Sequence, residues 1–370
     1  MSNRFRQKVV LKNPLNKPDW LIIGLTLGLT IFGIIMVGNV SVLKAYQDFG
    51  DKFHYLRLQI YWALLGIGAF FVTSLLNYNF WKKVAIPLII FSLITLILVL
   101  IPGIGTQALG ARRWLGFGFF SFQPAELAKL SFIFYLSSFF SKKKNIWPFL
   151  AILGILVGLI MLEPDLGTTV VLAATGLSIY FISGAPIFAI GLIALFSILS
   201  GIGLIITSPY RKERLLTFFD PSRDPLGASY HIRQVLIAIG SGGLFGVGLG
   251  QSRQKYEYLP EVTTDSIFAI IAEETGFIGG VIILGLFLLL VWRGFRIAKE
   301  APDEFGKLLA VGITSWIGFQ ALINLCSMVA LVPLTGIPLP FISYGGSSLV
   351  LSLVAMGILV NISKQRVLKK

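Results

Sequence analysis

Long runs of apolar residues, separated by short polar breaks, follow one another along nearly the whole chain. A run of about 20 apolar residues is needed to cross the hydrocarbon core of a membrane as a helix. Ten such runs are predicted to be helices, at about 21–42, 58–76, 84–102, 124–141, 147–163, 168–184, 186–208, 266–292, 307–331 and 343–363. They lack the residue-by-residue alternation of a membrane barrel. The predicted fold class is therefore an all-α integral membrane protein.

One break in this pattern is much longer than the others. Residues 209–264 separate the seventh and eighth runs and form a large loop. A single membrane domain is expected over residues 1–370, with tails at 1–20 and 364–370. No small-residue cleavage site follows the first apolar run, so a cleaved signal peptide is not expected.

Composition supports the membrane assignment. Of the 370 residues, 55% are hydrophobic and only 13% are charged, and the mean hydropathy is +0.83. A soluble domain is nearer one quarter charged. The single cysteine, Cys326, excludes a disulfide framework.

The distribution of lysine and arginine predicts the orientation. The net charge of +14 gathers largely in one set of loops and at both termini, including Lys82, Lys83 and Lys142–Lys144. Such loops face the cytoplasm in membrane proteins. The expected location is the bacterial cytoplasmic membrane, crossed several times, with both termini cytoplasmic. The basic cytoplasmic loops of a membrane protein explain the positive charge better than nucleic-acid binding does.

The chemistry-bearing motifs lie in the opposite loops. Asp265 begins the eighth run, in "YLPEVTTDSIFAIIAEETG" (258–276), where it could cap a helix or act as a functional carboxylate. Glu273 and Glu274 follow, on different helical faces, and are interpreted mainly as members of ion pairs or hydrogen bonds. Glu126 and Lys129 are spaced to touch one another, and each could also face a cavity.

Basic residues near these carboxylates suggest an anionic ligand. Arg112 and Arg113 precede Trp114 and could lie among lipid headgroups or clamp a pyrophosphate. Arg211 and Arg233 belong to a wider positive field, and Ser343 opens the small-residue stretch "SYGGSS". Glu163 and Asp165 flank Pro164; oxygen ligands of this kind would suit Mg²⁺ or Mn²⁺, the one cofactor that the sequence suggests.

Four stretches together resemble the SEDS family of bacterial cell-wall proteins (shape, elongation, division and sporulation). They are "GARRWL…FSFQPAELAKL", "EPDLGTT", "IAIGSGGLFGVGLGQSRQKYEYLPEVTTDSIFAIIAEETG" and "PLTGIPLPFISYGGSS". The details are more similar to the division branch, FtsW, than to the elongation branch, RodA. The resemblance implies a glycosyltransferase that polymerises lipid II at the outer leaflet together with a class B penicillin-binding protein.

The same resemblance implies roles for particular residues. The family's catalytic aspartate falls on Asp265, which is expected to act as the general base. The family's arginine pair falls on Arg112 and Arg113, its helix-four pair on Glu126 and Lys129, and its "PDLGT" acid on Asp165. Two positions depart from the family pattern: Thr263 replaces the usual histidine, and His231 replaces a glutamine.

Two other functions remain open at this point. A flippase or transporter for the same lipid-linked precursor would explain basic loops and buried charges, but it predicts polar residues along a path through the membrane. A non-catalytic scaffold for a penicillin-binding protein would not account for Asp265 together with the arginines.

Overall fold

The computed structural model describes residues 17–108, 111–117, 120–142, 145–206, 208–220, 229–256 and 259–366. Within these ranges the chain forms the helices α1 (Trp20–Val40), α2 (Val42–Phe49), α3 (His54–Leu75), α4 (Asn79–Leu100), α5 (Pro124–Phe140), α6 (Trp147–Leu162), α7 (Leu166–Ile182), α8 (Ile187–Ile206), α9 (Pro209–Phe219), α10 (Tyr230–Ser241), α11 (Ile267–Lys299), α12 (Glu304–Met328) and α13 (Gly346–Lys364). Lys143, Lys144, Arg223 and the residues before 17 and after 366 lie outside the described ranges, as does the side chain of Arg211.

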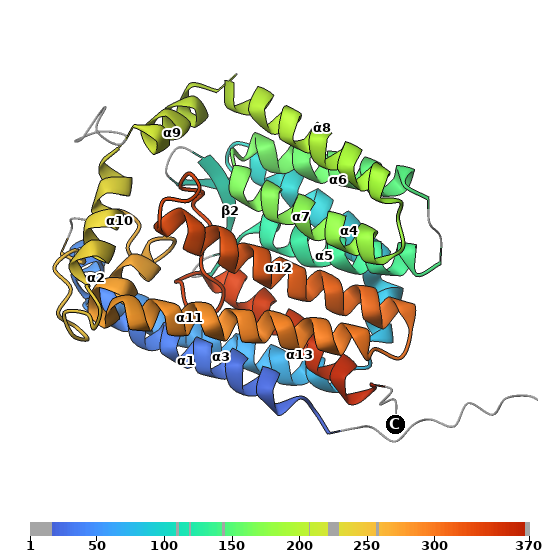
Figure 1. Cartoon of the computed structure of the whole chain (residues 1–370), viewed down its shortest axis with the longest axis horizontal. Coiled ribbons are helices and arrows are strands. Elements are labelled where there is room, and N and C mark those ends of the chain that lie inside the picture. The colour runs from blue at the N-terminus through green and yellow to red at the C-terminus, as the bar shows by residue number, and fades with distance from the viewer. Residues whose placement is uncertain are drawn as a thin grey trace, which may run out of the picture.

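Each of the ten predicted helices is present, with ends that mostly shift by a few residues. Six of them, α1, α3, α4, α11, α12 and α13, are long and apolar enough to cross a membrane. Of the others, α5, α6 and α7 have only 16 or 17 residues, and α8 has 20. The helices run side by side as a bundle, and the protein is a multi-pass membrane protein (Figure 1).

A small antiparallel sheet interrupts the predicted all-helical fold. Its strands β1 (Gly105–Ala108), β2 (Ala111–Phe117) and β3 (Phe120–Phe122) form a meander in the order β1-β2-β3 between α4 and α5. The predicted 209–264 loop likewise contains α9 and α10. The sheet, α2, α9 and α10 lie toward one end of the bundle, called the sheet end below, and the C-terminus lies at the other, the termini end (Figure 1).

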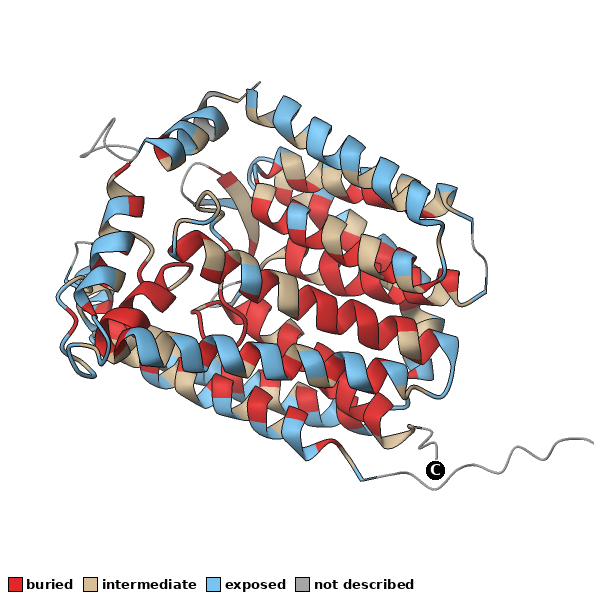
Figure 2. Ribbon diagram, in the orientation of Figure 1, coloured by how far each residue is buried: buried red, intermediate tan, exposed pale blue. Residues whose placement is uncertain are grey.

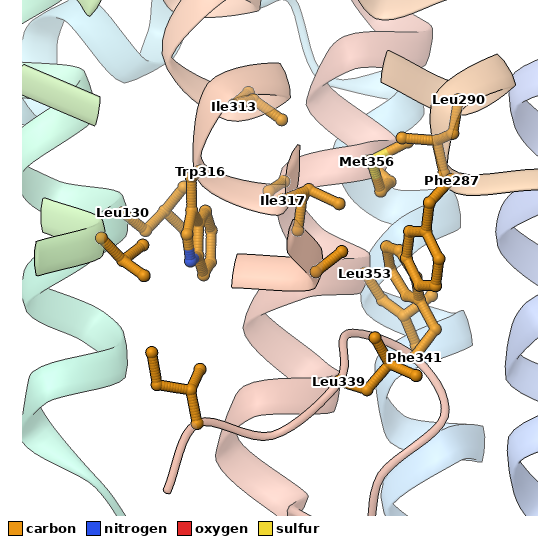
Figure 3. Close-up of a cluster of buried hydrophobic side chains, with 14 of the residues drawn as sticks. Leu130, Phe287, Leu290, Ile313, Trp316, Ile317, Leu339, Phe341, Leu353 and Met356 are labelled. Atoms are coloured by element: carbon orange, nitrogen blue, oxygen red, sulfur yellow. The ribbon is translucent and has the colours of Figure 1, made fainter. Parts of the chain in front are cut away.

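Helices α12 and α13 form the buried centre of the bundle, while α8 lies at its edge with most of its residues exposed (Figure 2). Trp316 and Ile317 of α12 are fully buried, and Leu130 of α5 lies beside Trp316 (Figure 3). Leu339 and Phe341 extend this cluster from the loop before α13. The loop is therefore part of the packed core, and it holds a fixed position against α12.

At the termini end, buried charges are paired. Asp19 is 2% exposed and accepts hydrogen bonds from Arg293 at 2.7 Å and from Arg366 at 3.3 Å. Its backbone nitrogen also donates to Ser363. One carboxylate thus ties together the ends of α1, α11 and α13.

Helix α11 is broken at Gly276, where a continuous helix was predicted. Gly276 has φ 70° and ψ −169°, a conformation that is essentially restricted to glycine. The residues before the break, 267–275, form a short helix at the sheet end, and those after it form the long apolar segment. Glu273 and Glu274 lie before the break, on the short helix that follows Asp265.

Replacing Gly276 by alanine should destabilise the protein by at least about 2 kcal/mol, because the backbone is strained for any other residue. A Cβ there would also lie 2.3 Å from the Gly246 nitrogen and 2.5 Å from the Leu244 oxygen. Gly285→Ala is the matched control: the site is open, and alanine favours the helix by about 0.5–1 kcal/mol. Thermal unfolding in detergent measures both variants. Equal melting temperatures for the two variants would contradict this account of the break.

Candidate functional site

Asp265 lies in the turn that leads into α11 and is only 7% exposed. Its carboxylate accepts a hydrogen bond from Thr264 Oγ1 at 3.0 Å. The residue at the N-cap of α11 is Ser266, and the Asp265 carboxylate does not cap the helix. The alternative that Asp265 is a structural cap is therefore wrong, and its buried carboxylate needs another explanation.

The turn that carries Asp265 is clamped by the loop before α13. Asn324 Nδ2 donates to the backbone oxygens of Asp265 and Ile337, each at 2.8 Å. Tyr344 N donates to Thr263 O at 2.9 Å, and Ser343 Oγ donates to Thr264 O. Ser343 thus acts on the backbone beside Asp265. These bonds fix the direction of the Asp265 side chain.

Glu126 and Lys129 form the predicted contact, with Lys129 Nζ 2.8 Å from Glu126 Oε1. Both side chains are 2% exposed. Lys129 also donates to Gln320 Oε1 at 2.7 Å, and Gln320 Nε2 donates to Pro338 O at 3.0 Å. The buried pair is therefore linked through Gln320 to the loop that clamps Asp265.

Arg112 and Arg113 are neighbours on β2 at a β-bulge: Gln107 pairs with Arg112 and Thr106 with Trp114, so Arg113 is the extra residue and the regular alternation of side chains is interrupted there. Arg113 donates to the backbone oxygens of Glu163 at 2.8 Å and Pro164 at 2.7 Å. It is thereby engaged in holding the turn between α6 and α7. Arg112, beside it, is half-buried.

Asp165 is the N-cap of α7 and accepts from Thr168 N at 2.9 Å and from Thr168 Oγ1 at 2.8 Å. Glu163 is fully buried, and neither of its carboxylate oxygens has a hydrogen-bond partner among the described residues. Burial, with the Asp165 charge adding to it, raises the pKa of Glu163 to about 9. Glu163 is therefore protonated at neutral pH.

These two acids offer a poor site for a divalent cation. The Asp165 oxygens already accept hydrogen bonds from Thr168, which use lone pairs that a cation would need. In the described part of the chain, no three histidine, cysteine, aspartate or glutamate side chains come together in a way that could hold a metal ion. The residues present thus do not fit the Mg²⁺ or Mn²⁺ that the sequence suggested.

A pocket of about 200 Å³ lies between α9, α10 and the loop before α13. Its lining includes Glu213, Arg214, His231 and Leu334. Arg214 Nη1 donates to Leu334 O at 3.1 Å, and His231 Nε2 lies 2.7 Å from the Ser266 hydroxyl. The pocket therefore adjoins the residue that follows Asp265.

The groups around this pocket set the charge of the site. Burial, and then the nearby Glu261, raise the pKa of Asp265 to about 6, while Thr264 and Arg214 oppose the shift. Burial, and then Arg214, lower the pKa of His231 to about 4. At neutral pH the carboxylate is charged and the imidazole is neutral.

The sequence analysis singled out only part of this site. Arg233, one of its candidates, is exposed on α10 and forms none of the contacts described above. Arg214, His231, Asn324 and Gln320 were not chosen as site residues, although they surround or clamp the turn of Asp265. The sequence contained a signal for three of them. His231 departs from the family pattern, and Gln320 and Asn324 are polar residues in the middle of a long apolar helix.

Glu273 and Glu274 are engaged in hydrogen bonds and an ion pair, as predicted. Glu273 accepts from Ser252 Oγ and from Arg253 N at 3.1 Å. Glu274 accepts from Asn39 at 2.6 Å and pairs with Lys255 at 3.4 Å. Their partners come mainly from the loop after α10, so the two acids fasten that loop to the start of α11.

The helices and the site together define a class: a multi-pass membrane protein that carries a buried carboxylate near a polar pocket at one end of its bundle. The sequence model described as "Cell cycle protein", the FtsW/RodA/SpoVE family, matches residues 19–368. The chain belongs to this family. The predicted family is confirmed.

Curated relatives and solved structures agree with this membership. Stage V sporulation protein E of Bacillus subtilis is 45% identical, with 94% of this chain and 97% of that protein covered. A probable peptidoglycan glycosyltransferase FtsW of Coxiella burnetii is 40% identical, with 93% and 95% covered. RodA of Thermus thermophilus matches with a TM-score of 0.69 at 29% identity, covering 95% of this chain and 98% of that chain.

A second solved structure is more similar. It is a chain from a peptidoglycan synthase complex that coordinates polymerization and crosslinking, with a TM-score of 0.77 at 30% identity. The comparison covers 94% of this chain and 98% of that chain.

Lys129→Met should reduce the free energy of unfolding by about 3–5 kcal/mol, because it leaves Glu126 charged and unpaired in the interior. Lys307→Met is the matched control. It removes an ion pair of the same i,i+3 spacing, the one between Lys307 and Glu304, and the side chains of these two residues are 37% and 50% exposed. Such a pair contributes about 0–1 kcal/mol. Unfolding curves that shift equally for both variants would show that the buried pair is not special.

Proposed function

We propose that this chain is a peptidoglycan glycosyltransferase that polymerises lipid II at the outer leaflet of the bacterial cytoplasmic membrane. The observation that carries the proposal is the buried Asp265 carboxylate, held by backbone clamps beside Arg214 and a pocket. The names of the FtsW relatives and the similar synthase complex support the same activity.

The proposed orientation places the sheet end outside the cell and both termini in the cytoplasm. The basic residues near the ends of α4, α11 and α13 at the termini end support it: Lys82, Lys83, Arg293, Arg296 and Lys364. The site then opens on the side where a lipid-linked donor and a growing glycan would meet.

The reaction needs a base, an acceptor and a leaving group. A sugar hydroxyl attacks the anomeric carbon of the donor; the new carbon–oxygen bond forms as the bond to the polyprenyl pyrophosphate breaks. Asp265 accepts the hydroxyl proton. Its raised pKa of about 6 suits this role, because a base works best when its pKa lies near the working pH. A single displacement inverts the anomeric centre and needs no covalent enzyme intermediate.

The pyrophosphate that leaves carries the negative charge and needs cations nearby. Arg214 is the best-placed described cation, since it lines the pocket and lowers the pKa of Asp265. Arg112, half-buried on β2 beside Arg113, can supply a second charge. Lys129 supports the site from beneath, because it donates to Glu126 and Gln320.

The proposed partner is a class B penicillin-binding protein. The similar solved complex coordinates polymerization with crosslinking, and a transpeptidase would supply the crosslinking step to this chain. Lipid II and the membrane complete the expected partners.

Asp265→Asn should make no glycan polymer when the purified protein and its partner are supplied with lipid II. The variant should still fold, and it should melt at a higher temperature than the wild type at pH 7. The reason is that the folded state binds the Asp265 proton more tightly than the unfolded chain, so an ionised Asp265 costs stability above pH 6.

Asp51→Asn provides the control for this variant, since it makes the same change at a more exposed residue of the sheet end. Polymer formation by Asp265→Asn would remove Asp265 as the base. Lipid II movement across liposomes without polymer would indicate a transporter instead.

The polymerisation rate should fall about tenfold per pH unit below pH 6 and level off above about pH 7, because the base must be ionised. Glu261→Gln should move this acidic limb to lower pH, since it removes a negative charge that raises the pKa of Asp265. Rates measured from pH 5 to 8 test both statements. A limb that stays in place in Glu261→Gln would assign the titration to another group.

A further inference from the structure

The loop after α10 presents apolar side chains to the surface at the sheet end. From Gly242 to Gly250 the chain reads "GGLFGVGLG" and carries no polar side chain. Leu244, Phe245, Val247 and Leu249 are 63%, 79%, 43% and 68% exposed. Each would gain about 1.5–3 kcal/mol on full burial in an apolar environment. This group, called the apolar loop below, is unlike an ordinary water-exposed loop.

The apolar loop is held firmly in place. Val247 N donates to Glu273 O at 3.0 Å, and Gly248 N donates to Glu274 O at 3.1 Å. In the other direction, Phe277 N donates to Gly243 O at 2.9 Å and Ile278 N donates to Leu244 O at 3.2 Å. The apolar loop therefore lies beside residues 273–278 of α11, at the same level along the axis of the helix bundle.

That height can be compared with the thickness of a membrane. On the long segment of α11, residues 277–292 precede Arg293, which is paired with Asp19 at the termini end. These residues span about 24 Å at 1.5 Å per residue, whereas the hydrocarbon core is about 30 Å thick. The outer edge of the hydrocarbon therefore lies beyond Phe277, and the apolar loop falls inside it.

The neighbouring surface continues in the same way. Phe277, Val281 and Ile282 on α11 are 67%, 47% and 56% exposed, as expected of residues that face lipid. Leu236 and Ile237 on α10 are also exposed. The apolar loop is thus continuous with the lipid-facing side of a membrane span.

Polar residues border the apolar loop at its far side. Arg253 and Lys52 are exposed, and Tyr256, next to Lys52 in a shallow pocket, is 55% exposed. Lysine, arginine and tyrosine are the residues that occupy the headgroup level of membranes. Their arrangement places the headgroups directly above the apolar loop.

We propose that residues 244–249 insert into the acyl chains of the leaflet at the sheet end, which is the outer leaflet in the orientation given above. The occupant of this surface is lipid. The insertion links the site to the membrane surface, because the backbone oxygens of Glu273 and Glu274 join the apolar loop to the short helix that follows Asp265.

Depth-dependent fluorescence quenching tests this proposal. In a Cys326→Ser background, an environment-sensitive NBD label is placed at Phe245→Cys, with Leu249→Cys as a second site, and the protein is reconstituted in liposomes. Ile282→Cys on α11 gives the lipid reference, and Gln107→Cys on β1, which is exposed, gives the water reference.

Labels at 245 and 249 are expected to emit at shorter wavelength than the label at 107. Lipids that carry a nitroxide at acyl carbon 5 should quench them more strongly than lipids that carry it at carbon 12. Emission and quenching equal to those at 107 would overturn the proposal. So would a shift that appears only when a partner protein is added, which would show a protein-docking surface. Neither result depends on glycosyltransferase activity, so the proposed function would stand.

Discussion

The cost of a buried charge governs the arrangement of the sheet end. A carboxylate placed in a low-dielectric interior must be paired, protonated or put to use. Glu126, Glu273 and Glu274 are paired, Glu163 is protonated, and Asp165 caps a helix. Asp265 is buried with one side-chain hydrogen bond from Thr264 and a raised pKa. Its position fits the role of general base that we propose for it.

The neighbouring pairs serve this carboxylate indirectly. Two sets of hydrogen bonds connect the core of the bundle to the region of Asp265. In the first, Lys129 donates to Gln320, which donates to Pro338 O in the loop before α13. In the second, Asn324 donates directly to Asp265 O. Because α12 is buried along most of its length, the positions of Gln320 and Asn324 are set by packing (Figure 2). A rigid apolar core therefore determines where the proposed base stands, although none of its apolar side chains belongs to the proposed site.

Much of the fold follows from the sequence, because membrane helices are local: length and hydropathy are enough to locate them. The contact between Glu126 and Lys129 could be predicted for the same reason, since both lie on one helix. The sheet could not, because short strands depend on pairing between segments. The break at Gly276 also escaped, since its conformation depends on backbone atoms of residues 243–248. Arg214 and His231 approach Asp265 only through the folding of the long loop.

The break at Gly276 has a consequence for how the protein sits in different membranes. A spanning helix tilts when the bilayer becomes thinner or thicker. In a continuous helix such a tilt would carry Asp265 with it, whereas here the short helix before Gly276 is fastened to the apolar loop and to the loop before α13. The apolar loop is hydrogen-bonded to Glu273 and Glu274 before the break and to Phe277 and Ile278 after it, so the short helix is tied to the spanning segment through a loop that lies at the rim of the bilayer in the proposed orientation.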